Sequence, residues 1–166
     1  MYFRKWLLAI GLVVSSCGVA QAQVPTVVSL TPSSGTGLTQ TFSVVISDPA
    51  GLTDLKTTHL LFNTSTSGAS ACSVYYSVGS NQLYLYNDAG STLSAPVVPG
   101  SASTVANSQC TLNGTGSSYS KSGNNLTLNV ALTFAGAFTG QKNAYVYASG
   151  NDGLSTGWVL EGTWTP

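Results

Sequence analysis

This 166-residue chain contains unusually few charged residues. Charged side chains make up 6% of it, against about a quarter in an average soluble protein. Beyond the first five residues there is no arginine, and the only basic side chains are three scattered lysines. Proteins that bind nucleic acid neutralise its phosphates with clustered lysine and arginine. We therefore expect no nucleic-acid partner.

Histidine is equally rare, which argues against common hydrolytic chemistry. A serine triad needs a histidine base, and the one histidine, His59, lies inside a strand-like run, where a structural role is the usual one. The acidic pairs Asp48/Asp54 and Asp152/Glu161 come closest to the two carboxyl groups of a glycosidase. Turn positions account for these aspartates without catalysis. We expect a non-enzymatic protein with no catalytic residues.

Long apolar runs are also missing. The apolar stretch at residues 7–14 is too short to span a bilayer as a helix, which takes about 20 residues. The basic pair Arg4-Lys5 precedes it, and small residues ending in Ala20-Gln21-Ala22 follow it. These are the three parts of a secretory signal peptide. We expect residues 1–22 to be removed and residues 23–166 to form one exported domain.

Cysteine occurs three times. Cys17 ends the segment Val14-Ser15-Ser16-Cys17, which resembles the lipobox of bacterial lipoproteins, so a lipid anchor at Cys17 is the alternative to cleavage after Ala22. A membrane partner is expected only in that alternative. Cys72 and Cys110 remain in either case, and two thiols in an oxidising compartment usually pair. We predict a disulfide between them.

What the chain has in abundance is alternation of apolar and polar residues with a period of two. The clearest run covers residues 126–134, and a second covers residues 41–47. Seven weaker runs fit strands at residues 26–30, 55–63, 72–78, 83–86, 109–113, 143–148 and 158–165. Two stretches rich in small and polar residues, 90–107 and 114–124, are expected to be long loops, the second a mobile one. Many short strands separated by turns predict an all-β fold, an antiparallel β-sandwich.

Four segments carry a resemblance to a known kind of module. They are Phe-Ser-Val-Val-Ile-Ser-Asp-Pro-Ala-Gly at 42–51, Leu-Tyr-Leu-Tyr-Asn-Asp-Ala-Gly at 83–90, Asn-Ser-Gln-Cys at 107–110 and Gly-Thr-Trp-Thr at 162–165. Together they resemble an uncharacterised module that recurs, often in tandem, in secreted and surface proteins of environmental bacteria. The resemblance covers nearly all of residues 25–166 and implies an immunoglobulin-like sandwich with its two cysteines paired. It supplies no catalytic residues. Here a single module follows the signal peptide, which argues against a spacer role.

Aromatic residues are the best candidates for a binding site. Two pairs of tyrosines occupy alternate positions, Tyr84 with Tyr86 and Tyr145 with Tyr147. If their aliphatic neighbours face the core, all four tyrosines face outward. On adjacent strands they would form a flat platform of the kind that stacks on sugar rings. The alternative is that they pack in the core or pair across strands. We expect Trp158 and Trp164 to be core anchors.

Aspartates in turns offer a second binding chemistry. Asp48 and Asp54 flank one turn region, and Asp88 and Asp152 lie in two others. Oxygen ligands from loops at one end of a sandwich suit Ca²⁺, which makes calcium a candidate where no cofactor is otherwise expected. Asx turns explain each aspartate without a metal.

The sequence as a whole predicts an exported bacterial protein, secreted or at the cell surface. Its expected role is that of an interaction or adhesion module, or a structural one, with an extracellular protein or polysaccharide as partner. The alternative is a carbohydrate-binding module that uses the four tyrosines.

Overall fold

Eleven strands make up this fold in the computed structural model, which describes residues 23–166. The strands are β1 (Thr26–Thr31), β2 (Ser34–Thr36), β3 (Thr39–Ser47), β4 (Leu55–Asn63), β5 (Cys72–Ser77), β6 (Gln82–Leu85), β7 (Thr104–Ala106), β8 (Cys110–Ser122), β9 (Asn125–Phe134), β10 (Lys142–Gly150) and β11 (Val159–Thr165). The expected signal peptide, with Cys17, lies outside the described residues.

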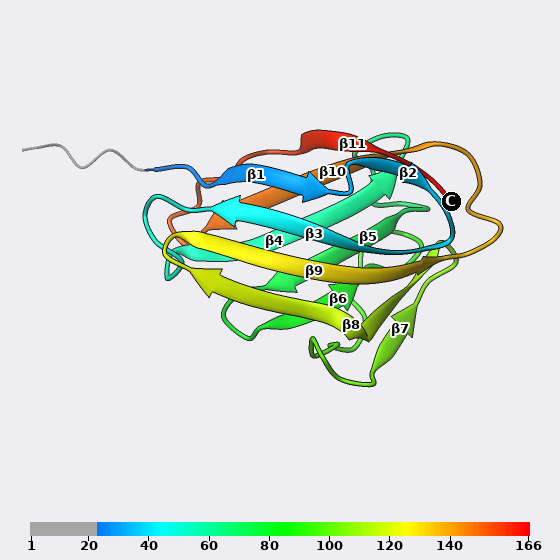
Figure 1. Cartoon of the computed structure of the whole chain (residues 1–166), viewed down its shortest axis with the longest axis horizontal. Helices are drawn as coiled ribbons and strands as arrows, with labels where there is room; N and C mark the ends of the chain where they lie inside the picture. The colour runs from blue at the N-terminus through cyan, green and yellow to red at the C-terminus, as the bar shows by residue number, and fades with distance from the viewer. Residues whose placement is uncertain (1–22) are drawn as a thin grey trace, which may run out of the picture.

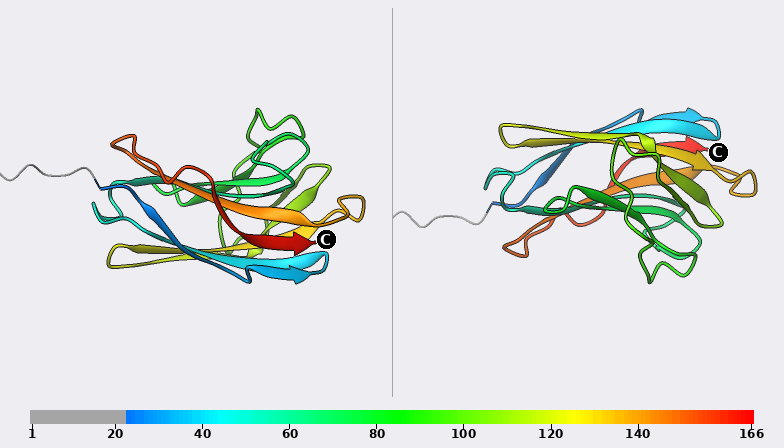
Figure 2. Two further views of the ribbon diagram at one scale, coloured as in Figure 1. Left: turned by 90° about the horizontal axis from the view of Figure 1, so that it is seen from above. Right: turned by 90° about the horizontal axis from the view of Figure 1, so that it is seen from below.

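The strands form two sheets that pack face to face (Figure 1). The five-stranded sheet has the order β1-β3-β9-β8-β7, and the six-stranded sheet has the order β2-β11-β10-β4-β5-β6. All described strand pairs are antiparallel except β2 and β11, which run parallel. Figure 2 shows the sheets from above and below as two separate layers.

The chain changes sheets early, between β1 and β2, next to a cis bond between Thr31 and Pro32. After this switch, β3, β9 and β8 lie opposite β11, β10, β4, β5 and β6. This is the strand order of a variable-type immunoglobulin domain, in which the second sheet has two extra strands. The expected all-β, immunoglobulin-like sandwich is confirmed.

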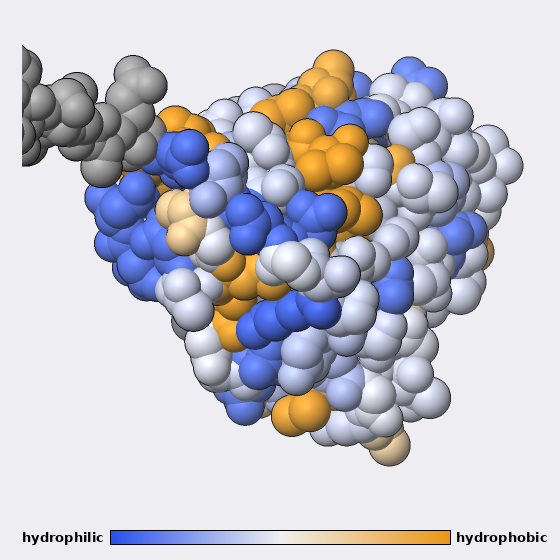
Figure 3. All heavy atoms as spheres, turned by 60° about the vertical axis from the view of Figure 1, so that its left-hand side comes forward, coloured by the Kyte–Doolittle hydropathy of each residue, from blue (hydrophilic) through white to orange (hydrophobic). Residues whose placement is uncertain are grey.

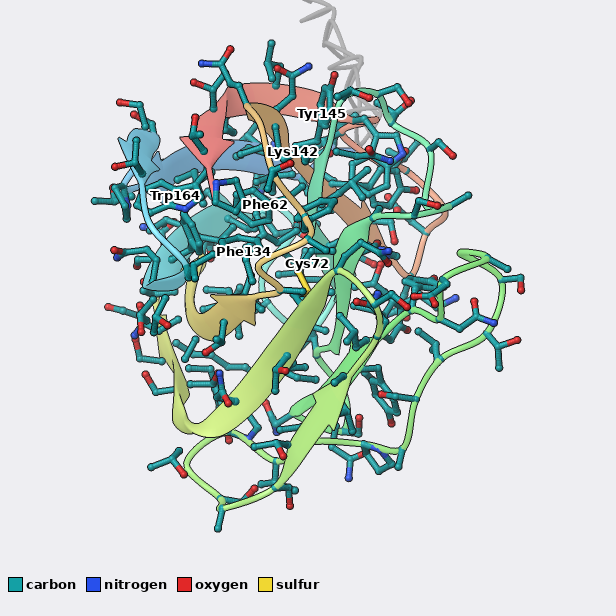
Figure 4. The ribbon with its side chains drawn as sticks, turned by 90° about the vertical axis from the view of Figure 1, so that its right-hand side faces the viewer. Phe62, Cys72, Phe134, Lys142, Tyr145 and Trp164 are labelled. Atoms are coloured by element: carbon teal, nitrogen blue, oxygen red, sulfur yellow. A yellow bond between two sulfur atoms is a disulfide. The ribbon has the colours of Figure 1, made fainter. Side chains whose placement is uncertain are left out.

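An aromatic cluster joins the two sheets in the core. Phe42 of β3 and Phe134 of β9 meet Phe62 of β4 from the opposite sheet, with ring centroids 4.6 Å apart for Phe42–Phe62 and 5.2 Å apart for Phe62–Phe134. Trp164 of β11 packs edge-on against Phe42 at 5.2 Å, and its Nε1 donates a hydrogen bond to the Gly37 carbonyl at 2.8 Å. Figure 4 shows Phe62, Phe134 and Trp164 pointing into this space. The prediction that Trp164 anchors the core is confirmed.

The predicted disulfide between Cys72 and Cys110 is also confirmed, and it links β5 of one sheet to β8 of the other (Figure 4). In antibody domains the conserved disulfide joins strands that correspond to β3 and β10 here. The bond in this protein joins a different pair of strands, closer to the edges formed by β6 and β7. A disulfide is typical of proteins that fold in an oxidising environment.

The prediction of a mobile loop at residues 114–124 is wrong. β8 continues through this stretch to Ser122 and forms a long hairpin with β9. The pairing shifts register between Asn113 and Ser118, and Ser117 fills the irregularity. Its buried hydroxyl donates to the Asn113 carbonyl at 2.6 Å and accepts from the Ala131 N–H at 3.0 Å. Pairing with β9 outweighs the weak strand propensity of glycine and serine here.

The other predicted loop, residues 90–107, is irregular for most of its length. It carries β7 near its end, which pairs with β8. Val97 fixes its middle, because its N–H and carbonyl both bond to the backbone of Leu83 at 2.8 and 2.9 Å. The middle of this loop therefore lies along the edge of β6, while most of its other residues are exposed.

Candidate functional site

The outer face of the six-stranded sheet carries a line of aromatic side chains. Strand pairing sets His59 of β4 opposite Tyr147 of β10 and opposite Tyr75 of β5. Tyr75 in turn lies opposite Tyr84 of β6. Directly opposed residues point to the same side of a sheet, so these side chains line up across four strands. We call the resulting set the aromatic row: Trp158, Tyr147, His59, Tyr75 and Tyr84.

Each ring of the aromatic row contacts the next one. The centroid distances are 5.5 Å for Trp158–Tyr147, 5.3 Å for Tyr147–His59, 4.9 Å for His59–Tyr75 and 5.7 Å for Tyr75–Tyr84. Most of these contacts are edge-to-face, the arrangement that aromatic pairs prefer. The row is therefore a continuous surface of rings that extends from the start of β11 to the edge strand β6.

His59 lies at the centre of this surface. Besides its neighbours in the row it contacts Trp158 at 5.8 Å and stacks on Tyr86 at 6.3 Å with an interplanar angle of 17°. Burial among these rings lowers the pKa of the His59 imidazole from 6.5 to about 4. At neutral pH the side chain is thus an uncharged aromatic ring with polar edges.

All four tyrosines that the sequence singled out lie half-buried on this outer face. The two pairs do not lie on adjacent strands, as a platform of four tyrosines would require, because β4 and β5 separate β10 from β6. Tyr84 and Tyr147 belong to the aromatic row, and Tyr86 stacks on its central ring. Tyr145 lies beside the row, opposite Leu61 of β4 and Leu160 of β11, and its hydroxyl accepts a hydrogen bond from Asn143 Nδ2 at 2.9 Å.

The prediction that Trp158 is a core anchor is wrong as well, because this side chain is 38% exposed on the outer face. Trp158 and Trp164 are six residues apart, so strict alternation would send both to the same side. The pairing of β11 with β10 shifts register between Ala144 and Tyr145, which leaves one extra residue in β11. This bulge reverses the alternation, so that Trp164 faces the core and Trp158 faces solvent.

Sequence reasoning missed His59 and Tyr75 as members of the site. Both alternate with buried residues of their own strands, Leu60 and Val74 among them, so an outward direction was readable from the sequence. Their neighbours in the row, however, come from strands far away in the chain. Only the strand order places them between the two tyrosine pairs.

Two shallow hollows adjoin the aromatic row. The first, of about 420 Å³, is lined by Lys56, Thr57, His59, Tyr75, Tyr147, Ser149 and Trp158. The second, of about 430 Å³, shares Lys56 and Tyr75 with the first and extends toward Lys121 and Asn151 at one end of the sandwich. No acidic side chain lines either hollow. Two of the three described lysines, Lys56 and Lys121, line these hollows.

The turns at that end of the sandwich also gather acidic residues. Asp48 follows β3, Asp54 precedes β4 and Asp152 follows β10, and we call these three the carboxylate cluster. Burial raises the pKa of the Asp48 carboxyl, and the negative charges of Asp54 and Asp152 add to this effect. Figure 3 shows this end of the molecule, where hydrophilic surface surrounds separate apolar patches.

Asp88, the fourth aspartate proposed as a calcium ligand, does not join the carboxylate cluster. It follows β6, which leads away from this end, and its carboxylate accepts hydrogen bonds from the Ser108 N–H at 2.8 Å and the Ser108 hydroxyl at 2.6 Å. These bonds lower the pKa of Asp88. Asp88 therefore has a local structural role that ties two loops together.

Within residues 23–166, no group of three or more His, Cys, Asp or Glu side chains is arranged to hold a metal ion. The same part of the chain contains no helix of the length and hydrophobicity that crossing a membrane requires. Comparison with protein-family models, with curated proteins and with solved structures finds no match to this chain.

Proposed function

We propose that this protein is an exported, non-enzymatic binding module whose ligand is an extracellular polysaccharide, held on the aromatic row. The observation that carries this proposal is the unbroken contact of five rings across the outer face of one sheet. Flat rings with hydroxyl or N–H groups at their rims offer apolar stacking and hydrogen bonds together. A sugar ring presents the same combination, with an apolar face and a polar rim.

The shape of the surface supports an extended ligand. Neighbouring strands lie about 4.8 Å apart, so the four paired rings from Tyr147 to Tyr84, which cross four strands, span about 14 Å, and Trp158 packs against both Tyr147 and His59 at one end. The hollow beside the rings is lined only by residues of one sheet and by Trp158, so it is open toward solvent. Pockets for small molecules enclose most of the ligand surface. An open row of this length suits a polymer of several sugar units better than a single small molecule.

The setting of the domain supports an extracellular ligand. The Cys72–Cys110 disulfide fits an oxidising compartment, and residues 1–22 have the pattern of a secretory signal peptide. The resemblance to modules of secreted and surface proteins points in the same direction. The chain has few charged residues and many serines, threonines, asparagines and glycines, so these small polar residues supply most of its solubility.

A second candidate is adhesion to another protein, and one observation favours it. Leu160, which is 57% exposed, extends the outer face beyond Trp158 and Tyr145. Exposed apolar side chains next to aromatic residues are typical of protein interfaces. Replacement of Leu160 by serine separates the two functions, because a protein partner would lose affinity while a sugar stacked on the aromatic row would not.

The test is a pull-down of the purified protein with insoluble polysaccharides, both neutral and acidic. Tyr147→Ala removes a central ring of the row, and we expect about tenfold weaker binding, or about 1.4 kcal/mol. The matched control is Tyr119→Ala, because Tyr119 is 41% exposed but lies on β8 of the opposite sheet. Failure of the wild-type protein to bind any polymer, or equal losses in both variants, would contradict the proposal.

A further inference from the structure

Two turns that are about 100 residues apart in sequence are locked together at one end of the sandwich. The Asp48 carbonyl accepts from the Gly51 N–H and the Gly51 carbonyl accepts from the Asp54 N–H, both at 2.9 Å, so residues 48–54 form two consecutive turns. The Asn151 N–H then donates to the Asp54 carbonyl at 2.7 Å, and its Nδ2 donates to the Thr53 carbonyl at 3.1 Å. These bonds hold the three members of the carboxylate cluster near one another.

Two carboxylate oxygens in this cluster are buried without a hydrogen-bond partner. Asp48 is 0% exposed, and only its Oδ1 is satisfied, by the Ala50 N–H at 2.9 Å. Its Oδ2 has no partner, and neither does the buried Oδ2 of Asp54. A buried oxygen of a charged group that lacks a donor destabilises the fold. The charges that act on Asp48 are themselves negative, so they increase this cost.

Gly150 provides the space for two of these carboxylates. A Cβ atom at position 150 would collide with Asp54 Oδ2 and would lie 2.7 Å from Asp152 Oδ1. Both oxygens therefore approach the bare Cα of a glycine from the same side. The chain thus brings carboxylates from both turns to one point, where Asp54 Oδ2 has no hydrogen-bond partner and Asp152 Oδ1 accepts from the Leu154 N–H at 2.9 Å.

We propose that the carboxylate cluster binds a calcium ion, with Asp48 Oδ2 and Asp54 Oδ2 as ligands and Asp152 beside them. Ca²⁺ takes six to eight oxygen ligands and accepts backbone carbonyls and water in an irregular shell. Two buried carboxylates and the carbonyl-rich turns around them suit this chemistry. Zn²⁺ prefers nitrogen and sulfur ligands and Mg²⁺ demands a near-ideal octahedron, so neither fits this irregular, all-oxygen site.

A calcium ion at this point would coordinate the two buried oxygens that lack a hydrogen-bond partner, Asp48 Oδ2 and Asp54 Oδ2. It would also offset the repulsion among the three carboxylates. It would also link the turn between β3 and β4 to the turn after β10. Extracellular calcium sites have dissociation constants of about 0.1 to 1 mM, and we expect this range here. The site is separate from the aromatic row, and its existence does not depend on polysaccharide binding.

The test is the melting temperature of the purified protein at pH 7, measured in EGTA and in 5 mM CaCl₂. We expect a rise of roughly 5 °C with calcium, and binding heat in a calorimetric titration with CaCl₂ alone. Asp48→Asn and Asp54→Asn keep the side-chain volume and remove a charged ligand, so each should lose the rise. The matched control is Asp88→Asn, which changes an aspartate outside the cluster and should keep the full rise.

The comparison is made within each variant, so a general change in stability does not affect it. If Asp48→Asn fails to fold, Asp54→Asn and the calorimetric titration of the wild-type protein decide the question. No calcium-dependent rise in the wild-type protein overturns the proposal. An equal rise with NaCl of matched ionic strength, or a full rise in both cluster variants, overturns it as well.

Discussion

His59 and Tyr147 lie opposite each other on neighbouring strands, with ring centroids 5.3 Å apart and ring planes at 87°. The edge of one ring thus points at the face of the other, and Tyr75 meets His59 in the same way from the other side. A histidine held between two tyrosines in this manner is part of an aromatic surface.

The two tryptophans near β11 should differ sharply in their effect on stability. Trp164→Ala removes a buried ring from the aromatic cluster of the core, which costs about 3 to 5 kcal/mol of unfolding free energy. Trp158→Ala removes a partly exposed ring and should cost less than about 1.5 kcal/mol. Urea denaturation of both variants measures the difference. Similar losses would show that Trp158 also supports the core.

Stability should fall in acid because of His59. Its pKa is about 4 in the folded protein and 6.5 in the unfolded chain. Between these values the unfolded state binds more protons, so the contribution of His59 is complete above pH 6.5 and is lost as the pH falls toward 4. His59→Phe keeps the ring and removes the titration.

The measurement is the unfolding free energy of wild type and His59→Phe between pH 7 and pH 4. The unfolding free energy of wild type should fall more steeply than that of His59→Phe as the pH decreases from 6.5 toward 4. Comparison with the variant removes the effects of the acidic groups, which titrate in both proteins. Parallel curves over this range would contradict the prediction.

Position 150 should not tolerate a side chain. Gly150→Ala would place a methyl group against Asp54 Oδ2 and Asp152 Oδ1, and overpacking of this kind costs about 1 to 3 kcal/mol. Gly136→Ala is the matched control, because a Cβ there meets no atom within 4 Å. Thermal unfolding of both variants gives the answer, and equal melting temperatures would show that the carboxylates move aside at little cost.

The disulfide should contribute strongly to stability. It closes a loop with a sequence separation of 38 residues, for which chain entropy gives about 4 kcal/mol. The double variant Cys72→Ala/Cys110→Ala should therefore unfold at a much lower urea concentration. An unchanged midpoint would mean that the sheets hold each other without the crosslink. Reduction of the wild-type protein with dithiothreitol provides an independent check.

Local patterns predicted the strands well where one face is buried. Strong alternation predicted most of β9, and the bounds of β4 match the run at residues 55–63. The pattern failed for the second half of β8, because its glycines and serines are held by pairing with β9 and by the hydroxyl of Ser117. Cross-strand contacts of this kind are not encoded in the local sequence.

The candidate sites were predictable only in part, for a similar reason. Alternation placed the tyrosines on an outer face, but the order of strands in the sheet decides which of them become neighbours. A single bulge in β11 was enough to move Trp158 from the core to the surface. The aspartates of the turns were visible in the sequence, whereas the separation of Asp88 from the other three depends on the direction of β6.

The parallel pairing of β2 with β11 has a mechanical consequence. β2 lies near the start of the described chain, β11 ends it, and Figure 1 shows that the chain enters at one end of the sandwich and leaves at the other. A force that pulls these ends apart acts on β2 and β11 in opposite directions along their length. The hydrogen bonds between them are then loaded together in shear and do not open one after another. Tension along the long axis would thus load this short parallel pairing in shear.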